Sequence, residues 1–357
     1  MKPKRILHVA SRAERYLGAR YYGIPYKINN GFIRAGHYVY WFSDRDMARY
    51  LAPIPSRKFG IGKCNKAFVE FCRNMKPEVL VLCHADIIRV ETLLEVKKFL
   101  PDLRILQYNV DGLHIEANVA SILSRADIVD ATFVTTGGSI LSTVAGEKSF
   151  AAFMPNPVDP SIDTGQAHMH RDLPIDVFFA GGLAKWSEQT DLRALSIRQL
   201  RERLPDRKML FSRWLWGTEF METLSQSKIG LCFSHRAPET YQGDGGTLYH
   251  YCSDRIGQYM GNGVLTFVNK LNDLNSLYGD DAVVTIDTFD DLIEKVEYFL
   301  NNEEQRMAIA ARGHQVAHEE FNSELIARYL IESVFDESFS HDYRWPTKRF
   351  YREISSR

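Results

Sequence analysis

Short apolar runs alternate with amphipathic segments through the first part of the chain, a pattern typical of alternating strands and helices. We predict strands at residues 5–10, 38–42, 77–83, 103–108, 131–135 and 150–154, and helices at 25–35, 91–100 and 115–124. Strands that alternate with helices indicate a parallel, doubly wound sheet. In such a sheet, ligand-binding side chains gather at the carboxyl ends of the strands.

A second series of the same kind follows a proline-rich turn. Pro155-Asn-Pro-Val-Asp-Pro160 and the polar stretch 161–172 predict a linker. Beyond it we expect strands at 175–180 and 228–233, and helices at 191–204, 220–226, 290–301 and 303–321. The predicted organisation is an N-terminal domain over residues 1–160, a C-terminal domain over 173–335, and a tail over 336–357.

The segment 253–268 reads as a helix that ends at a glycine and runs into a strand. Ile256, Tyr259 and Met260 form an apolar stripe, Gly263 suits the end of the helix, and 264–268 has strand composition. Its first residues are polar and would lie at the helix N-terminus, where unpaired N–H groups favour a phosphate. An ordinary helix–strand unit of a parallel sheet is the alternative.

Composition and charge narrow the class of protein. The chain has 357 residues, 45% hydrophobic and 25% charged, enough for two globular domains, and no apolar run long enough to span a bilayer. Five scattered cysteines without a CxxC pair predict free thiols in a reducing compartment, so we expect a cytoplasmic protein.

The N-terminal part of the chain is basic: residues 1–60 hold 12 Lys and Arg against 3 Asp and Glu. That basic face suits an anionic membrane surface, a lipid phosphate or an acidic polymer, or it is only a solvated face. No module for nucleic acid accompanies it.

Candidate catalytic residues follow the N-terminal strands. Asp111, in Tyr108-Asn-Val-Asp-Gly112, could deprotonate or orient an acceptor hydroxyl; capping the helix that begins near Ile115 is the alternative. His84 and Asp86 form a second candidate pair after the strand 77–83. Gly18 and Tyr22, in the loop after the first strand, are candidates for contact with an acceptor.

Three motifs resemble the GT-B glycosyltransferases. They are Pro155-Asn-Pro-Val-Asp159, Gly181-Gly182 directly after a strand, and Asp254-Arg-Ile-Gly-Gln-Tyr-Met-Gly-Asn-Gly263. The last of these, with the preceding strand, is most similar to the CgeB-like branch of the family-4-type enzymes. The resemblance implies two Rossmann-like, doubly wound domains facing a cleft, with the tail crossing back to the N-terminal domain.

It also implies a nucleotide-sugar donor held by the C-terminal domain, an acceptor held by the N-terminal one, and no metal or other cofactor. The glycines let the backbone approach a phosphate, while Lys185 and Arg255 can supply positive charge. The donor-binding candidates are Gly181, Gly182, Lys185, His235, Asp244, Gly245, Asp254, Arg255 and Gln258. For Asp244 and Gly245, turn formation is an equal alternative.

The sequence departs from the family at three positions, one of which is Gly182, where the family commonly has an arginine. His250 and Gln258 stand where family-4-type enzymes carry two glutamates. An amide at 258 can still bind a ribose hydroxyl but carries no charge. We therefore expect a glycosyltransferase of bacterial surface polysaccharide synthesis, acting on a glycan or lipid-linked acceptor, with peripheral membrane contact through the basic N-terminal domain. A nucleotide-sugar epimerase of the same fold and a non-catalytic scaffold are the alternatives.

Overall fold

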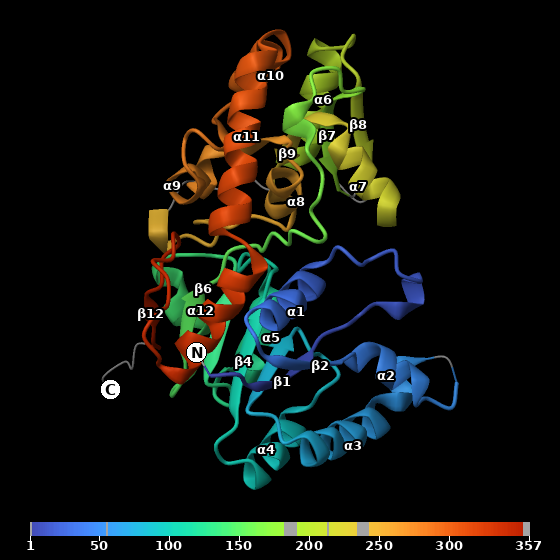
Figure 1. Cartoon of the computed structure of the whole chain (residues 1–357), viewed down its shortest axis with the longest axis vertical. Coiled ribbons are helices and arrows are strands. Elements are labelled where there is room, and N and C mark those ends of the chain that lie inside the picture. Colours follow the sequence, from blue (N-terminus) through green and yellow to red (C-terminus); the bar gives the residue numbers. More distant parts are fainter. Residues whose placement is uncertain (1, 55, 182–190, 213, 234–242, 353–357) are drawn as a thin grey trace. The chain divides into compact units, whose positions relative to one another are not determined.

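The computed structural model describes residues 2–54, 56–181, 191–212, 214–233 and 243–352. The chain divides into two compact units (Figure 1). The first unit is Met1–Pro155 together with Ser323–Arg357, and the second unit is Asn156–Asn322. Each unit is built around its own sheet.

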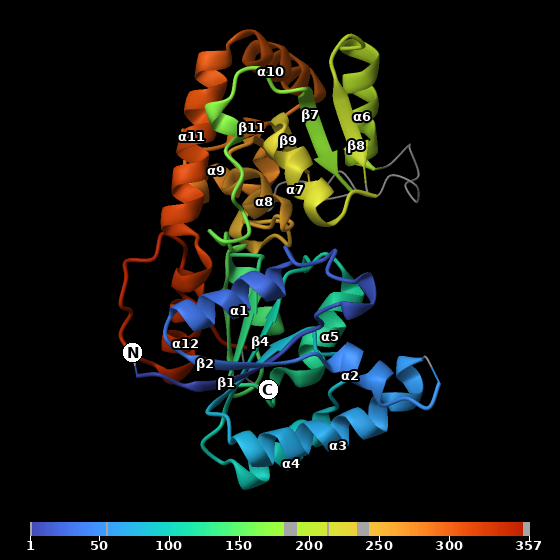
Figure 2. The same cartoon turned by 45° about the vertical axis from the view of Figure 1, so that its right-hand side comes forward.

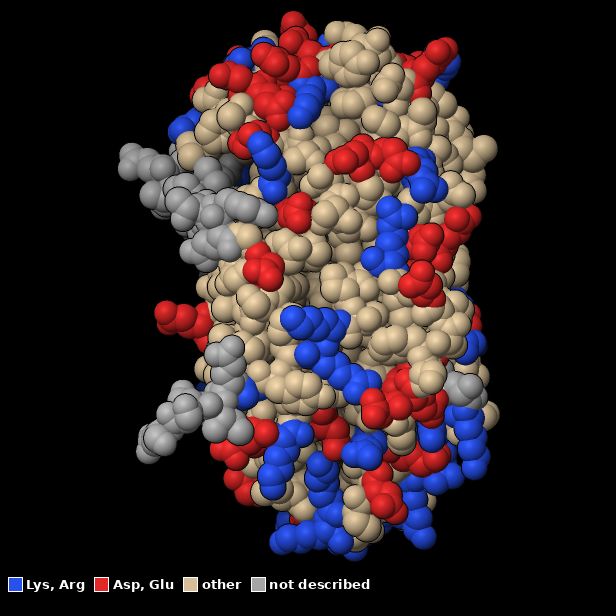
Figure 3. Space-filling view, turned by 90° about the vertical axis from the view of Figure 1, so that its left-hand side faces the viewer, with Lys and Arg blue, Asp and Glu red and all other residues tan. Residues whose placement is uncertain are grey.

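The first unit holds a sheet in the order β12-β6-β5-β4-β3-β1-β2, parallel except for β12. Its strands are β1 (Arg5–Val9), β2 (Tyr38–Phe42), β3 (Val79–Cys83), β4 (Arg104–Asn109), β5 (Ala131–Val134), β6 (Phe150–Phe153) and β12 (Arg349–Phe350). Its helices are α1 (Ile24–Arg34), α2 (Asp44–Tyr50), α3 (Arg57–Met75), α4 (Val90–Phe99), α5 (Glu116–Ala126) and α12 (Ser323–Phe335), with short 3₁₀ turns η1 (Glu14–Tyr16) and η2 (Ser139–Val144). Lysine and arginine side chains are frequent on the face of this unit that Figure 3 shows.

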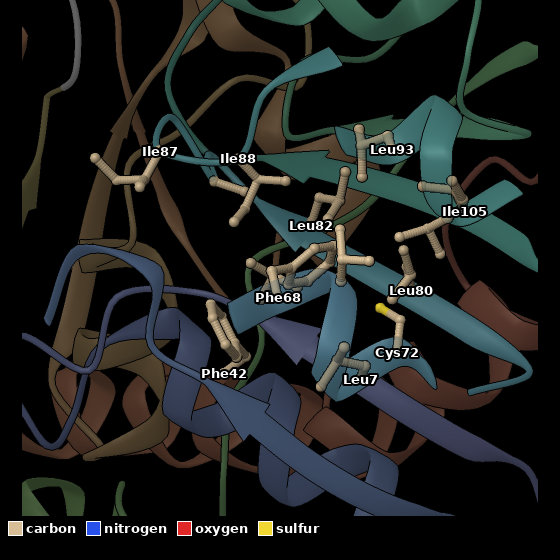
Figure 4. Close-up of a cluster of buried hydrophobic side chains, with 14 of the residues drawn as sticks. Leu7, Phe42, Phe68, Cys72, Leu80, Leu82, Ile87, Ile88, Leu93 and Ile105 are labelled. Carbon is tan, nitrogen blue, oxygen red and sulfur yellow. The ribbon is translucent and has the colours of Figure 1, made fainter. Parts of the chain in front are cut away.

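The first sheet is covered on both faces because its strands are apolar on both sides. On one face, Phe68 and Cys72 of α3 and Leu93 of α4 pack on Leu7 and Leu82 and on neighbouring apolar residues (Figure 4). On the other face lie α1 and α12, as Figure 2 also shows. There Phe32 of α1 contacts His8 with ring centroids 6.2 Å apart, and Tyr329 of α12 contacts Phe133 at 5.6 Å.

The second unit has a smaller parallel sheet in the order β11-β10-β9-β7-β8. Its strands are β7 (Ile175–Ala180), β8 (Met209–Ser212), β9 (Ser227–Cys232), β10 (Leu265–Asn269) and β11 (Val284–Ile286). Its helices are α6 (Leu192–Arg203), α7 (Gly217–Ser225), α8 (Arg255–Gly261), α9 (Leu274–Tyr278), α10 (Phe289–Asn301) and α11 (Glu303–Glu320), with 3₁₀ turns η3 (Ala167–Met169), η4 (Gly243–Gly245) and η5 (Lys270–Asn272). Apolar residues of α6 and α10 fill one face of the sheet. Tyr259 of α8 packs against Phe178 on the other.

The boundaries between the units differ from the predicted ones at 160, 173 and 335. Helix α12 belongs to the first unit, although the sequence placed it in the C-terminal domain. It does so because it crosses α1 very closely: a Cβ added at Gly31 would lie 2.0 Å from the carbonyl oxygen of Ser323. The chain therefore passes between the units at Pro155–Asn156 and again at Asn322–Ser323. Near these points Val158 N–H donates to the carbonyl of Phe321 (3.0 Å).

The polar stretch 161–172 is not a free linker. Gly165 N–H donates to the Asn262 side chain (2.8 Å), and Ala167 N–H donates to the Asn262 carbonyl (3.0 Å), so this stretch is part of the second unit. In the tail, Trp345 is 2% exposed and its ring lies 5.6 Å from Tyr329 of α12. The tail then adds β12 antiparallel to β6. The tail thus packs on the first unit, and the helix by which the chain returns to that unit is α12.

In the described part of the chain, the pattern missed seven helices and strands: α2, α3, β8, α9, β11, α12 and β12. The inward positions of α3 are occupied by small or polar residues such as Gly60, Cys64 and Asn65, which weaken the apolar contrast of the helix. All five cysteines are buried free thiols, as predicted. None of the helices in the described part of the chain combines the length and apolar character needed to cross a bilayer.

Candidate functional site

In the first unit, the direction of the strand connections reverses between β1 and β3. Strand β1 lies between β2 and β3, and the later strands continue outward from β3. Ligands of doubly wound sheets bind outside the carboxyl ends of the strands at such a reversal. His84 directly follows β3, and Asp111 follows the neighbouring strand β4. The sheet order therefore brings two separately predicted candidates to the same edge.

His84 and Asp111 form a pair at this edge. The Nε2 atom of His84 lies 3.8 Å from the Oδ2 atom of Asp111. Burial lowers the pKa of His84 below its ordinary value, and the Asp111 carboxylate offsets this in part. The imidazole is therefore neutral near pH 7 and able to accept a proton, while Asp111 can stabilise the imidazolium that results.

The backbone around this pair is constrained. His84 and Ala85 have φ angles of 55° and 43°, the left-handed region that costs a residue other than glycine about 1–3 kcal/mol. Hydrogen bonds hold this turn: Ile88 N–H donates to the Ala85 carbonyl (3.1 Å), and Ile87 N–H donates to the buried Asp44 carboxylate (3.3 Å). Strain of this kind, retained at a strand end, is typical of functional positions.

Asp111 is held by asparagines rather than by the helix that follows. Its N–H donates to the Asn109 side chain (2.9 Å), and Asn118 of α5 donates to its carbonyl (2.8 Å). The N-cap of α5 is Ile115, and no side chain caps that helix. The capping alternative for Asp111 is therefore wrong, and its carboxylate is left toward solvent and His84, 58% exposed.

Asp86, the other predicted partner of His84, pairs instead with arginines. Its carboxylate accepts from Arg45 Nε at 2.7 Å and lies 3.7 Å from Arg57. Although burial acts in the opposite direction, the hydrogen bond from Arg45 and the charges of both arginines hold the pKa of Asp86 below its ordinary value. Asp86 therefore anchors the loop after β3 to α2 and α3.

A group of buried and half-buried polar side chains in the same unit, formed by His8, Asn29 and Tyr108, was not predicted from the sequence. His8 of β1 is fully buried, with Nε2 3.1 Å from the Tyr108 hydroxyl and Nδ1 3.3 Å from the Asn29 side chain. Burial lowers its pKa to about 4. It is thus a neutral core histidine that links β1, β4 and α1.

In the second unit, the connections reverse between β7 and β9, and Arg255 lies at that reversal. Its guanidinium donates to the carbonyl of Ala180, the last residue of β7 (3.0 Å), and to the carbonyl of Phe233, the residue after β9 (2.7 Å). It also lies over the ring of Phe179, 4.9 Å from the centroid. Arg255 therefore holds the ends of β7 and β9 together, a role that the sequence did not predict for it.

Gly181 has a packing reason for being glycine. A Cβ there would lie 2.5 Å from a ring carbon of Phe179, so any larger residue would displace that ring. Its N–H donates to the Ser212 carbonyl (2.9 Å) of β8. Trp214, which follows β8, is 68% exposed at the same edge.

Asp254 and Gln258 bind each other. Gln258 is buried, and its side-chain amide donates to the Asp254 carboxylate (3.1 Å). Helix α8 is only seven residues long, and its N-cap residue Asp254 makes no capping hydrogen bond. The amide at 258 is therefore suited to its neighbour, because a glutamate there would place two carboxylates side by side.

The hydrogen bond between Gln258 and Asp254 predicts the effect of Gln258→Glu, which restores the glutamate of the family-4-type enzymes. We expect the variant to lose about 1–3 kcal/mol of stability at pH 7, since a buried carboxylate would face Asp254 without a donor. The loss should shrink at pH 5 and should be relieved by Asp254→Asn in the same chain. Thermal unfolding measures it; a Gln258→Glu protein as stable as the wild type at both pH values would contradict the account.

The remaining candidates are less informative. Asp244 and Gly245 form the short turn η4 and are exposed. Gly18 has a φ of 89° in the loop after β1, whereas Tyr22 is 8% exposed and packs edge-on against Tyr21, so it offers little surface to an acceptor. His250 is buried and stacked on Tyr249.

Three predicted donor-site residues, Gly182, Lys185 and His235, lie outside the described residues. Among the described residues, no group of three or more His, Cys, Asp or Glu could hold a metal ion.

Comparison with known proteins agrees with this architecture. The glycosyl transferase-like family matches residues 168–332. No protein of curated function matches the chain by sequence. Sucrose-phosphate synthase from Thermosynechococcus elongatus matches 93% of this chain and 98% of its own, with a TM-score of 0.58 and 12% identity. HepE from Anabaena, in complex with UDP, matches 93% of this chain and 100% of its own, with a TM-score of 0.55 and 12% identity.

A putative UDP-N-acetylglucosamine 2-epimerase from Listeria monocytogenes is also similar, with a TM-score of 0.50 and 10% identity over 94% of this chain and 97% of that one. At these identities the likeness establishes the fold. The chain has two Rossmann-like units with parallel sheets, the fold of the GT-B glycosyltransferase structures.

Proposed function

We propose that this chain is a glycosyltransferase that moves a hexosyl or related group from a nucleotide-sugar donor to a hydroxyl of a glycan or glycolipid acceptor. The observation that carries the proposal is the His84–Asp111 pair at the strand reversal of the first unit (3.8 Å). Glycosyl transfer needs a base that removes the proton of the attacking hydroxyl. The fold and the family match over residues 168–332 support the same reaction class.

In this proposal His84 accepts the acceptor proton, and Asp111 orients the imidazole and stabilises its charged form. The second unit binds the nucleotide sugar at the reversal between β7 and β9, where Arg255 fastens Ala180 and Phe233. The exposed indole of Trp214 at that edge is suited to stacking on a base. Gly182, Lys185 and His235 remain sequence predictions for the same donor site.

Several finer points belong to the proposal as well. Solved HepE complexes contain UDP and UDP-glucose, which supports a uridine diphosphate donor here. We propose that the reaction needs no metal, that it serves bacterial surface polysaccharide synthesis, and that the enzyme acts in the cytoplasm and binds the inner face of the membrane peripherally. The likeness to the CgeB-like branch stays a sequence prediction.

Titration calorimetry with a panel of nucleoside diphosphates tests the donor site. We expect one nucleotide, UDP first, to bind best, and Arg255→Ala to weaken its binding by about tenfold or more. The two strand ends lose the side chain that joins them, and the proposed donor site loses a positive charge. Arg198→Ala, an exposed arginine of α6, is the matched control. Unchanged affinity in Arg255→Ala would remove Arg255 from the donor site, and binding of none of the nucleotides would contradict the function.

An epimerase is the second candidate, favoured by the likeness to the putative Listeria enzyme. It would interconvert epimeric nucleotide sugars without an acceptor, a change that proton NMR of the sugar resolves. A non-catalytic scaffold would bind a nucleotide sugar and leave it unchanged. It is favoured by the replacement of the two family glutamates with His250 and Gln258, which are both buried.

A further inference from the structure

Helices α2 and α3 form a hairpin in the first unit with an exposed apolar tip. Tyr50 at the end of α2 is 83% exposed, Ile54 in the turn is 51% exposed, and Phe59 in the first turn of α3 is 61% exposed. Figures 1 and 2 both show this hairpin lying at the periphery of the unit's sheet. Single exposed apolar residues are ordinary, but three within ten residues of chain form a patch.

The hairpin is packed firmly beneath its tip. A Cβ added at Gly60 would lie 1.7 Å from the Ala48 carbonyl oxygen, so α2 and α3 cross with backbones nearly in contact. Ala48, Cys64 and Phe68 are fully buried below this crossing. The tip residues therefore contribute little to the core, and the close packing of α2 on α3 holds them at the surface.

The charge around the tip that is not taken up in ion pairs is positive. Between Met47 and Val69 the sequence contains five basic residues and no Asp or Glu. Two of them are neutralised, Arg49 by Asp46 (3.0 Å) and Arg57 by Asp86 (3.7 Å). The other three, Lys58, Lys63 and Lys66, are exposed and make no ion pair with any described residue. Lys63 and Lys66 follow Phe59 on the outward face of α3 at helical spacing.

We propose that this surface, the docking tip formed by Tyr50, Ile54, Phe59, Lys58, Lys63 and Lys66, binds the anionic surface of a lipid bilayer. Aromatic and aliphatic side chains enter the boundary between headgroups and acyl chains, while lysines remain among the phosphates. A soluble polyanion would use the lysines and leave the apolar residues without a role. This proposal rests on the membrane contact included in the proposed function and names the surface that makes it. Vesicle binding is measured without donor or acceptor, so its failure is distinct from a failure of the transferase activity.

Co-sedimentation of the full chain with vesicles tests the proposal. We expect the wild type to bind vesicles of phosphatidylglycerol and phosphatidylcholine in equal parts, to bind pure phosphatidylcholine much less, and to dissociate as salt is raised. The triple variant Tyr50→Ser, Ile54→Ser, Phe59→Ser should lower partitioning by about tenfold or more. In Lys58→Glu, Lys63→Glu, Lys66→Glu, each reversed lysine should lower it by about fivefold or more.

Two control variants make the test specific. Lys2→Glu, Lys98→Glu, Lys148→Glu changes the net charge equally, and Ile33→Ser with Leu94→Ser removes exposed apolar residues outside the hairpin. Both should bind vesicles as the wild type does, and all variants should keep the wild-type melting temperature. Failure of the wild type to bind anionic vesicles would overturn the proposal, as would equal losses in the tip and control variants. A wild type that is dimeric, with a serine variant that is monomeric and still binds vesicles, would assign the tip to a second copy of the chain instead.

Discussion

Asp111→Asn is expected to lower donor turnover by about 100-fold or more, with a KM for the donor near that of the wild type. The substitution keeps the size of the side chain but removes the charge beside His84 Nε2. General acid–base catalysis contributes about 10²–10⁴ to rates, so removal of either member of the pair should cost that much. The measurement is release of nucleotide from the preferred nucleotide sugar.

The pH dependence and a double variant show whether the pair acts as a unit. Burial keeps the pKa of His84 below its ordinary value, so the base is active above that pKa and turnover should fall as the pH drops through it. His84→Gln should remove this acidic limb, and His84→Gln with Asp111→Asn should be no slower than the slower single variant. Asp102→Asn, an exposed carboxylate of the same unit, is the control. If turnover and its pH profile survive in His84→Gln, the pair is not the catalytic base.

Gly31→Val is expected to lower the stability of the first unit by about 3 kcal/mol or more. Its Cβ would lie 2.0 Å from the Ser323 carbonyl oxygen and 3.2 Å from the Ala327 methyl group, and the backbone of α12 cannot yield as a flexible side chain would. Helix α12 would have to leave α1, which uncovers part of one face of the sheet. Urea and thermal unfolding measure the loss.

Gly62→Ala is the matched control for this prediction. Gly62 lies inside α3, and a Cβ there meets no heavy atom within 4 Å. Alanine should therefore stabilise the helix by about 0.5–1 kcal/mol through its lower backbone entropy in the unfolded chain. If Gly31→Val unfolds at the same urea concentration as the wild type, the close crossing of α1 and α12 is wrong.

The regular elements that position the site could be predicted from local pattern. The strand 175–180 coincides with β7, and the strands before His84 and Asp111 were placed within two residues of their observed bounds. Buried parallel strands are short apolar runs, and these stand out against polar turns. In contrast, α12 carries no local information about which unit it covers, because the contact that decides this joins Gly31 to Ser323 across most of the chain.

At the candidate site too, local pattern predicted single residues but not the contacts between distant parts of the chain. His84 and Asp111 were each predicted from their places after strands, but their pairing follows from β3 and β4 being neighbours in the sheet. Arg255 and Gln258 were predicted from a motif that implies contact with the donor. Their observed hydrogen bonds, to Ala180 and Phe233 and to Asp254, depend on strand ends and on a helix position that the motif does not describe. Tyr22 was a loop candidate, and its burial depends on packing that sequence did not show.

The most direct test of the central claim is proton NMR of the preferred nucleotide sugar, incubated with the purified chain and no acceptor. A glycosyltransferase whose base is His84 should slowly release nucleoside diphosphate and free sugar, since water can take the place of the acceptor hydroxyl, and His84→Gln should abolish that release. An intact nucleotide sugar with an inverted sugar centre would show an epimerase. A nucleotide sugar that is bound but recovered unchanged would contradict an enzymatic role.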